Sequence, residues 1–216
     1  MRDASKRNIL GVLIDAVDYE AATDFVFLAA REKRSAAISA LAVHGLMTGV
    51  FNREQKFRLN HFDLLLPDGQ PVRWALNLLY KAKLKDRVYG PNLTRRICER
   101  AAAEGVPVYF YGSTPEILSL LRQEIFAFEF REMLGMPTLA VGAAFPFLAG
   151  AINQAPVWMQ NAGLEWLFRL VSEPNRLWRR YVYLNPAYLF LITLQALGLS
   201  RFAPDGKSPA EELLYG

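Results

Sequence analysis

The chain has 216 residues, 52% of them hydrophobic and 21% charged, which suits one sizeable core and excludes extended disorder. Its formal net charge is +4, and it contains two histidines and a single cysteine, Cys98. One cysteine excludes a disulfide framework and a cysteine-rich zinc site, and it favours a reducing, cytoplasmic setting. Residues 1–7 are rich in charge and lead into only a short apolar run, so we expect no secretory signal.

The first part of the chain alternates short apolar runs with amphipathic segments. Residues 9–14 predict a strand, and the pattern after Asp18 predicts a helix that ends near Arg34. The next predicted elements are a strand at 36–43, a helical stretch after Gly45, a strand at 62–66 and a helix at 72–80. Repeated strand and helix predict an α/β protein with a Rossmann-like, open and mostly parallel sheet.

The alternation continues in the middle of the chain. Residues 93–104 predict a helix, and 106–111 predict a strand rich in Val, Tyr and Phe. Ser113 begins a capping signal for a helix that extends to about residue 134, and 138–141 returns to the sheet. We therefore expect one α/β domain over residues 1–155.

Beyond residue 156 tryptophans and arginines alternate, and Pro174 and Pro186 are expected to divide the sequence into short helices. Residues 156–203 are interpreted as a helical appendage and 204–216 as a flexible tail. The stretch 181–199 has no charged residue, but Asn185, Pro186 and Gln195 interrupt it. These interruptions favour an amphipathic helix that lies on the membrane over one that spans it.

Asp68 and Gly69 are the first candidates for chemistry. They follow Pro67 directly after a predicted strand, and ligands of open α/β sheets bind beyond the carboxyl ends of the strands. The same residues also suit an ordinary turn, in which proline fixes φ and glycine accepts a positive φ. The spacing alone favours the turn.

Two predicted helix starts could bind phosphate through backbone amides. One follows Gly112 and Ser113, and the other contains Gly90, Asn92 and Thr94. Both starts also fit ordinary capped helices. His44, after the second predicted strand, could contact substrate or serve as a structural histidine.

Arg169, Arg176 and Arg179 are spaced by seven and three residues, so they share one face if the helix continues through Pro174. They could bind a diphosphate or anionic lipid headgroups, or form a solvated basic face. Nucleic acid would need a broader basic surface. The sequence has no Asp-x-Asp pair, Walker loop or dinucleotide fingerprint, so we expect neither a metal nor a cofactor.

Several separated motifs occur in one order between about residues 36 and 199. They are Leu65-Leu66-Pro67-Asp68-Gly69, Val88-Tyr89-Gly90-Pro91-Asn92-Leu93-Thr94, Val108-Tyr109-Phe110-Tyr111-Gly112 and Gly163-Leu164-Glu165-Trp166-Leu167-Phe168-Arg169-Leu170, then Glu173-Pro174 and Arg179-Arg180-Tyr181. With these motifs the sequence resembles the WecG/TagA/CpsF family of glycosyltransferases.

The resemblance implies transfer of a sugar, often of the N-acetylmannosamine type, from a UDP-sugar to an acceptor linked to undecaprenyl diphosphate. It implies inversion without metal, Asp68 as the general base, and peripheral attachment at the inner face of the bacterial plasma membrane. The products would be cell-surface polysaccharides, and a homo-oligomer is one expected assembly. The resemblance also implies that the carboxyl-terminal arginines bind the lipid diphosphate. Together with the candidates from the residues themselves, the expected substrate-binding set is His44, Gly69, Gly90, Asn92, Thr94, Gly112, Ser113, Arg169, Arg176 and Arg179.

The sequence also departs from the family pattern. The family's Thr-x-Asn-x-His segment reads Ala40-Leu41-Ala42-Val43-His44, and its Gly-Ala-Phe-Asp-Phe segment reads Ala143-Ala144-Phe145-Pro146-Phe147. Between Arg122 and Phe130 about one βαβ unit is missing, together with a loop near the nucleotide. An alternative function is therefore a catalytically impaired remnant that binds a membrane or a partner.

Overall fold

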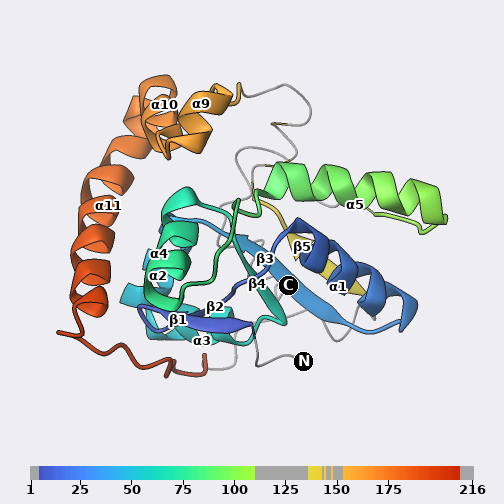
Figure 1. Ribbon diagram of the computed structural model, residues 1–216, viewed down its shortest axis with the longest axis horizontal. Helices are drawn as coiled ribbons and strands as arrows, with labels where there is room; N and C mark the ends of the chain where they lie inside the picture. Colours follow the sequence, from blue (N-terminus) through green and yellow to red (C-terminus); the bar gives the residue numbers. More distant parts are fainter. Residues whose placement is uncertain (1–4, 110–135, 143, 145–146, 148–152, 210–216) are drawn as a thin grey trace.

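The computed structural model describes residues 5–109, 136–142, 144, 147 and 153–209 (Figure 1). Its centre is a parallel three-stranded sheet with the order β4-β3-β5. The strands are β3 (Ala36–Leu41), β4 (Leu64–Pro67) and β5 (Pro137–Ala140). Ile38 pairs with Leu64 on one side, and Ala36 pairs with Pro137 on the other. The predicted α/β class and parallel sheet are confirmed.

Alternating side chains of the central strands enter two hydrophobic clusters, one on each face of the sheet. Ile38 and Leu66 pack with α1 (Tyr19–Arg31) and α5 (Gly90–Glu104). Leu41 and Leu65 lie on the opposite face. The helices that cover that face are α2 (Val43–Phe51), α3 (Arg53–Asn60), α4 (Gln70–Tyr80) and α11 (Pro174–Ala196). The sheet is therefore enclosed between two helical layers (Figure 1).

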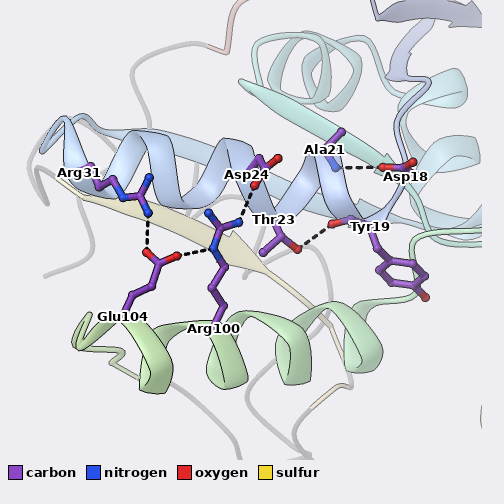
Figure 2. Close-up of polar contacts among 8 residues, drawn as sticks. All are labelled: Asp18, Tyr19, Ala21, Thr23, Asp24, Arg31, Arg100 and Glu104. Atoms are coloured by element: carbon purple, nitrogen blue, oxygen red, sulfur yellow. Dashed lines mark hydrogen bonds and ion pairs between the residues drawn. The ribbon is translucent and has the colours of Figure 1, made fainter.

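Ion pairs fasten α1 to α5. Arg100 Nη1 lies 2.5 Å from Asp24 Oδ1, and Arg31 Nη2 lies 2.7 Å from Glu104 Oε2 (Figure 2). Pairs this exposed contribute little stability. Tyr19, at the first turn of α1, lies beside the start of α5 (Figure 2), where its hydroxyl accepts from Tyr89 N–H.

The single strand predicted at residues 9–14 is wrong, because these residues contain the turn of a β-hairpin. β1 (Lys6–Ile9) pairs antiparallel with β2 (Val12–Asp15), and Leu10 and Gly11 form the turn with φ of 54° and 87°. Positive φ at both positions is typical of a type I′ turn. A leucine in the first turn position made the segment look like one continuous apolar run.

The strand predicted at 106–111 is also wrong where the structure describes it. Residues 106–109 are not in a strand, and Tyr109 is exposed; 110 and 111 lie outside the described residues. Pro107 lacks a backbone donor, and the strand preference of Val and Tyr requires a neighbouring strand to pack against. The helix predicted from Ser113 to about 134 lies outside the described residues too.

The carboxyl-terminal helices are α9 (Val157–Asn161), α10 (Glu165–Ser172) and α11. Pro174 begins α11, as expected, but Pro186 lies inside that helix and does not divide it. The interior proline is tolerated because Tyr188 and Ile192, beyond it, are buried in the main hydrophobic cluster. Gln195 also holds the end of α11 by accepting from Leu10 N–H at 2.9 Å and donating to Asn8 O.

The three candidate arginines lie on one helix face only if the helix continues through Pro174. One helix ends at Ser172 and the next begins at Pro174, so that condition is not met. Arg169 belongs to α10, whereas Arg176 and Arg179 belong to α11, and the placement of their side chains lies outside the description. No helix among the described residues is long and apolar enough to span a bilayer. Residues 204–207, interpreted from sequence as free tail, are held against α3: Asn60 Nδ2 donates to Pro204 O, and Lys207 N–H donates to Arg53 O.

Candidate active site

Three helices start at the carboxyl edge of the sheet. α2 follows β3, α4 follows β4, and the start of α5 lies against the ends of the strands, where Val88 N–H donates to Pro67 O at 2.9 Å. Ala42, Gly69 and Tyr89, the residues that precede these helices, form no capping hydrogen bond with their own side chains. Uncapped amino ends attract anions, because their amides and the helix dipole carry partial positive charge.

Gly69 does not need to be glycine for the turn that it forms. Its φ is −85°, and an added Cβ would meet its neighbours at an ordinary 3.7 Å. The turn explanation of Pro67-Asp68-Gly69 assumed positive φ at the glycine, so the structure removes that part of the explanation.

Gly90, in contrast, is required by close packing. A Cβ there would lie 3.0 Å from Val141 O, at the end of β5. Because α5 approaches so closely, the Gly90 N–H reaches the Asp68 carboxylate and donates to it. The sequence therefore places a carboxylate at the tip of β4 and a backbone donor against it.

Asp68 is half-buried, and its pKa is raised to about 7. Burial is the main cause, and the negative charge of Glu165 adds to it. Arg87, the Gly90 N–H and Arg169 act in the opposite direction. A carboxyl group with this pKa exchanges a proton near neutral pH, as a general acid or base requires.

Arg87 links the sheet edge to the carboxyl-terminal helices. Its buried guanidinium lies 2.6 Å from Glu165 Oε2 on α10, and Nη2 donates to Gln160 Oε1 on α9 at 3.3 Å. The same guanidinium stacks 4.3 Å from the centre of the Tyr89 ring. Arg87 thus pairs with a carboxylate from another segment while it stabilises the ionised form of Asp68.

Arg169 brings a second cation from α10. Its guanidinium lies 5.8 Å from the Phe147 ring, and its buried Nε has no hydrogen-bond partner among the described residues. A buried guanidinium donor without an acceptor is suited to an anionic ligand. The site therefore combines one proton-exchanging carboxyl group with two arginines and three helix amino ends.

A sequence model of the glycosyl transferase WecG/TagA/CpsF family matches residues 7–122 and 118–202. The chain belongs to the WecG/TagA/CpsF family. No solved structure matches it. The two matched segments overlap at 118–122, next to the place where the sequence is expected to lack a family segment, and that junction lies outside the described residues.

The WecG/TagA/CpsF family is a family of glycosyltransferases, so the site can be compared with the residues that the resemblance implied. Asp68, Gly69, Gly90 and Arg169 lie at the edge described above. Asn92, in the first turn of α5, is exposed and hydrogen-bonds to the Tyr19 hydroxyl. His44 is half-buried in the first turn of α2.

The remaining candidates are less informative. The Thr94 hydroxyl donates to Gly90 O at 2.9 Å, so its proton serves the helix rather than a ligand. Gly112 and Ser113 lie outside the described residues. Within the described ranges no group of three or more His, Cys, Asp or Glu is arranged to hold a metal ion.

Sequence reasoning missed Arg87, Tyr19, Tyr89 and Glu165 as site residues. Arg87 immediately precedes the Val88–Thr94 motif, and a charged residue at the border of such a motif is a usable signal. Tyr19 gave none, because its hydroxyl reaches the site only through the packing of α1 on α5, where it accepts from Tyr89 N–H at 2.9 Å.

Proposed function

We propose that this WecG/TagA/CpsF protein transfers a hexose, for example of the N-acetylmannosamine type, from a UDP-sugar to an acceptor linked to undecaprenyl diphosphate. Asp68 is the general base of this proposal, and its environment is the observation that carries it. A half-buried carboxyl group with a pKa of about 7 lies at the carboxyl end of β4 and accepts from the Gly90 N–H.

In the proposed reaction the acceptor hydroxyl oxygen attacks the anomeric carbon of the donor sugar. The bond from that carbon to the UDP oxygen breaks, UDP leaves with the electron pair, and Asp68 takes the hydroxyl proton. Attack opposite to the leaving group inverts the anomeric centre. A base with a pKa near the working pH is ionised before the step and still holds the proton after it.

Positive charge near Asp68 supports the departure of a diphosphate in this proposal. Arg87 lies there but is paired with Glu165, whereas the buried Arg169 Nε has no hydrogen-bond partner among the described residues and is the open donor. The starts of α2 and α4 add backbone amides at the same edge, whereas the first amide of α5, that of Gly90, already binds Asp68. Developing charge on the leaving phosphates could thus be stabilised by groups of the chain itself, without metal. Arg176 and Arg179 are proposed to bind the lipid diphosphate.

The outer surface of α11 supports attachment to a membrane, which the proposal places at the inner face of the plasma membrane. Its buried side carries Leu177, Tyr188 and Ile192. Large apolar side chains remain exposed on the other side, and they are Trp178, Val182, Tyr183, Leu189 and Phe190. An exposed row of this kind is suited to partial insertion among lipid headgroups.

The catalytic proposal is tested by UDP release from UDP-sugars in the presence of a polyprenyl-diphosphate-linked acceptor. We expect Asp68→Asn to eliminate UDP release and to leave the fold intact. Unchanged turnover in that variant rejects Asp68 as the base.

The alternative, an impaired remnant that binds a membrane or partner, is favoured by the missing family segment. Nucleotide titration separates the two functions. Clear binding of UDP or a UDP-sugar by the unmodified chain counts against the remnant, whereas absence of binding and turnover favours it.

Membrane attachment is tested by liposome sedimentation. Deleting the whole carboxyl-terminal region would expose the hydrophobic core, because Tyr188 and Ile192 belong to it. Substituting Tyr183 and Phe190 by glutamate, at 68% and 64% exposure, alters only the outer surface. Leu78→Glu on α4, also 68% exposed, is the matched control. We expect the Tyr183 and Phe190 double variant to sediment less with anionic liposomes than Leu78→Glu does. If the two variants sediment equally, α11 has another role.

A further inference from the structure

A polar pocket lies beside the proposed base and is not explained by the proton transfer. It has a volume of about 250 Å³ and lies between the first turn of α4, the segment that leads into α5, and α9. Five amide side chains line it: Gln70, Asn92, Gln154, Gln160 and Asn161. Amides offer a donor and an acceptor together, so such a lining matches a ligand that carries many hydroxyl groups.

Two buried groups in this pocket lack partners. Gln70 is 5% exposed and Tyr89 is 6% exposed, and both line the pocket. Gln70 Oε1 and the Tyr89 hydroxyl form no hydrogen bond within the described part of the chain. Unpaired buried polar groups are unfavourable in the free protein, so each of them needs an explanation. A ligand that satisfies both is the direct one.

Several other side chains of the pocket are held by contacts of their own. Gln160 donates to Ala155 O at 2.7 Å and accepts from Arg87, and Arg87 is paired with Glu165. Tyr19 accepts from the Tyr89 backbone. The pocket is therefore held in shape by its own hydrogen bonds, while one acceptor and one hydroxyl remain open to a ligand.

We infer that this pocket binds the uncharged ring of a hexose, with Gln70 Oε1 accepting from a sugar hydroxyl or acetamido N–H and the Tyr89 hydroxyl donating to a sugar oxygen. The inference rests on the proposed function and adds the residues that select the sugar. Gln70 is two residues beyond Asp68, and Tyr89 precedes Gly90, whose N–H holds Asp68. A ring seated here lies next to the base.

Burial raises the pKa of Tyr89, and the nearby carboxylates raise it further, so this hydroxyl stays protonated. The charge of Arg87 is paired with Glu165, and Asp86 also lines the pocket. Among the described residues that line the pocket, a sugar carboxylate would find no unpaired cation, so uronic acids are expected to be excluded. The ligand is therefore a neutral hexose.

The sugar can come from the UDP donor or from the lipid-linked acceptor, and paired probes distinguish the sources. In the donor arm, UDP is compared with UDP-glucose, UDP-N-acetylglucosamine, UDP-N-acetylmannosamine and UDP-glucuronate. In the acceptor arm, octyl diphosphate is compared with octyl N-acetylglucosaminyl diphosphate. Binding is measured by calorimetric titration of the full chain, so no turnover is required.

Tyr89→Phe removes the open hydroxyl, and Gln70→Leu removes the open Oε1 together with Nε2; both substitutions keep a similar volume. In one arm we expect each variant to bind the sugar-containing probe about tenfold more weakly and to bind its sugar-free counterpart unchanged. The melting temperature of free Tyr89→Phe should not fall, because that substitution removes only an unpaired polar group. Asn153→Ala, an exposed amide outside the pocket lining, is the control and should bind every probe as the unmodified chain does.

Three results would overturn the inference: equal weakening of sugar-containing and sugar-free probes, no weakening in either arm, or binding of UDP-glucuronate as tight as that of UDP-glucose. The inference and the proposed base can fail separately. If Gln70→Leu loses sugar affinity while Asp68→Asn keeps full turnover, the base is wrong and the pocket stands. If Asp68→Asn abolishes turnover while both pocket variants bind normally, only the pocket is wrong.

Discussion

Replacing Asp68 by asparagine should change how the stability of the protein depends on pH. The folded protein holds the Asp68 proton more tightly than the unfolded chain, because the pKa rises from 3.8 to about 7 on folding. The wild-type free energy of unfolding should therefore fall as the pH rises from 4 to 7, relative to a variant that cannot ionise. Each pKa unit corresponds to about 1.36 kcal/mol, so the full difference is up to about 4 kcal/mol.

The measurement is urea unfolding of both proteins between pH 4 and pH 8. We expect Asp68→Asn to gain stability relative to the wild type across this range and to reach a plateau above about pH 7. Glu20→Gln, which removes an exposed carboxylate from α1, should follow the wild-type pH profile. A constant difference between wild type and Asp68→Asn at all pH values would refute a raised pKa at Asp68, and with it the argument for a base tuned to neutral pH.

Three further substitutions test the geometry. Gly90→Ala should lower UDP release at least about tenfold, because its Cβ would press on Val141 O and move the N–H that holds the base. Gly163→Ala should lower both stability and UDP release, because φ is 71° and the new Cβ would lie 2.5 Å from the Trp74 ring, which displaces α10. Tyr188→Phe should lower the free energy of unfolding by about 1 kcal/mol, because its hydroxyl donates to a carbonyl of α4 at 2.9 Å.

Matched glycines and a matched tyrosine control these tests. Gly69→Ala has room for its Cβ and should unfold like the wild type, whereas Gly90→Ala should not. Gly105→Ala has a φ of 67° but no neighbour within 4 Å, so it isolates backbone strain from contact with Trp74. Tyr183→Phe changes an exposed hydroxyl and should leave stability unaltered. If a variant and its control changed stability equally, the contact proposed for Gly90, Gly163 or Tyr188 would be contradicted.

The sequence predicted the parallel sheet because its buried strands are short apolar runs with clear helical periods between them. It failed where local preference and tertiary context disagree. Leu10 has positive φ in a turn that usually takes asparagine or glycine, and Pro186 remains inside a helix because the residues after it are buried. Neither the turn conformation of Leu10 nor the burial that follows Pro186 is visible in a window of neighbouring residues.

The candidate site was predictable in part for the same reason. Asp68 and Gly90 stand at strand and helix ends that periodicity locates, so the sequence marked each as a candidate, although it did not predict the hydrogen bond between them. Arg87 and Glu165 are 78 positions apart, and no spacing rule joins them. Their pairing depends on α10 returning to the sheet edge, which only the three-dimensional arrangement shows.

The position of α10 also makes proton binding and helix movement interdependent. α10 contributes to the environment of Asp68 through Glu165, which raises its pKa, and Arg169, which lowers it, while burial is the largest effect. These two side chains act in opposite directions, so the position of α10 and the proton affinity of Asp68 are thermodynamically linked. A ligand that shifts either side chain relative to Asp68 therefore changes the number of protons bound as it binds.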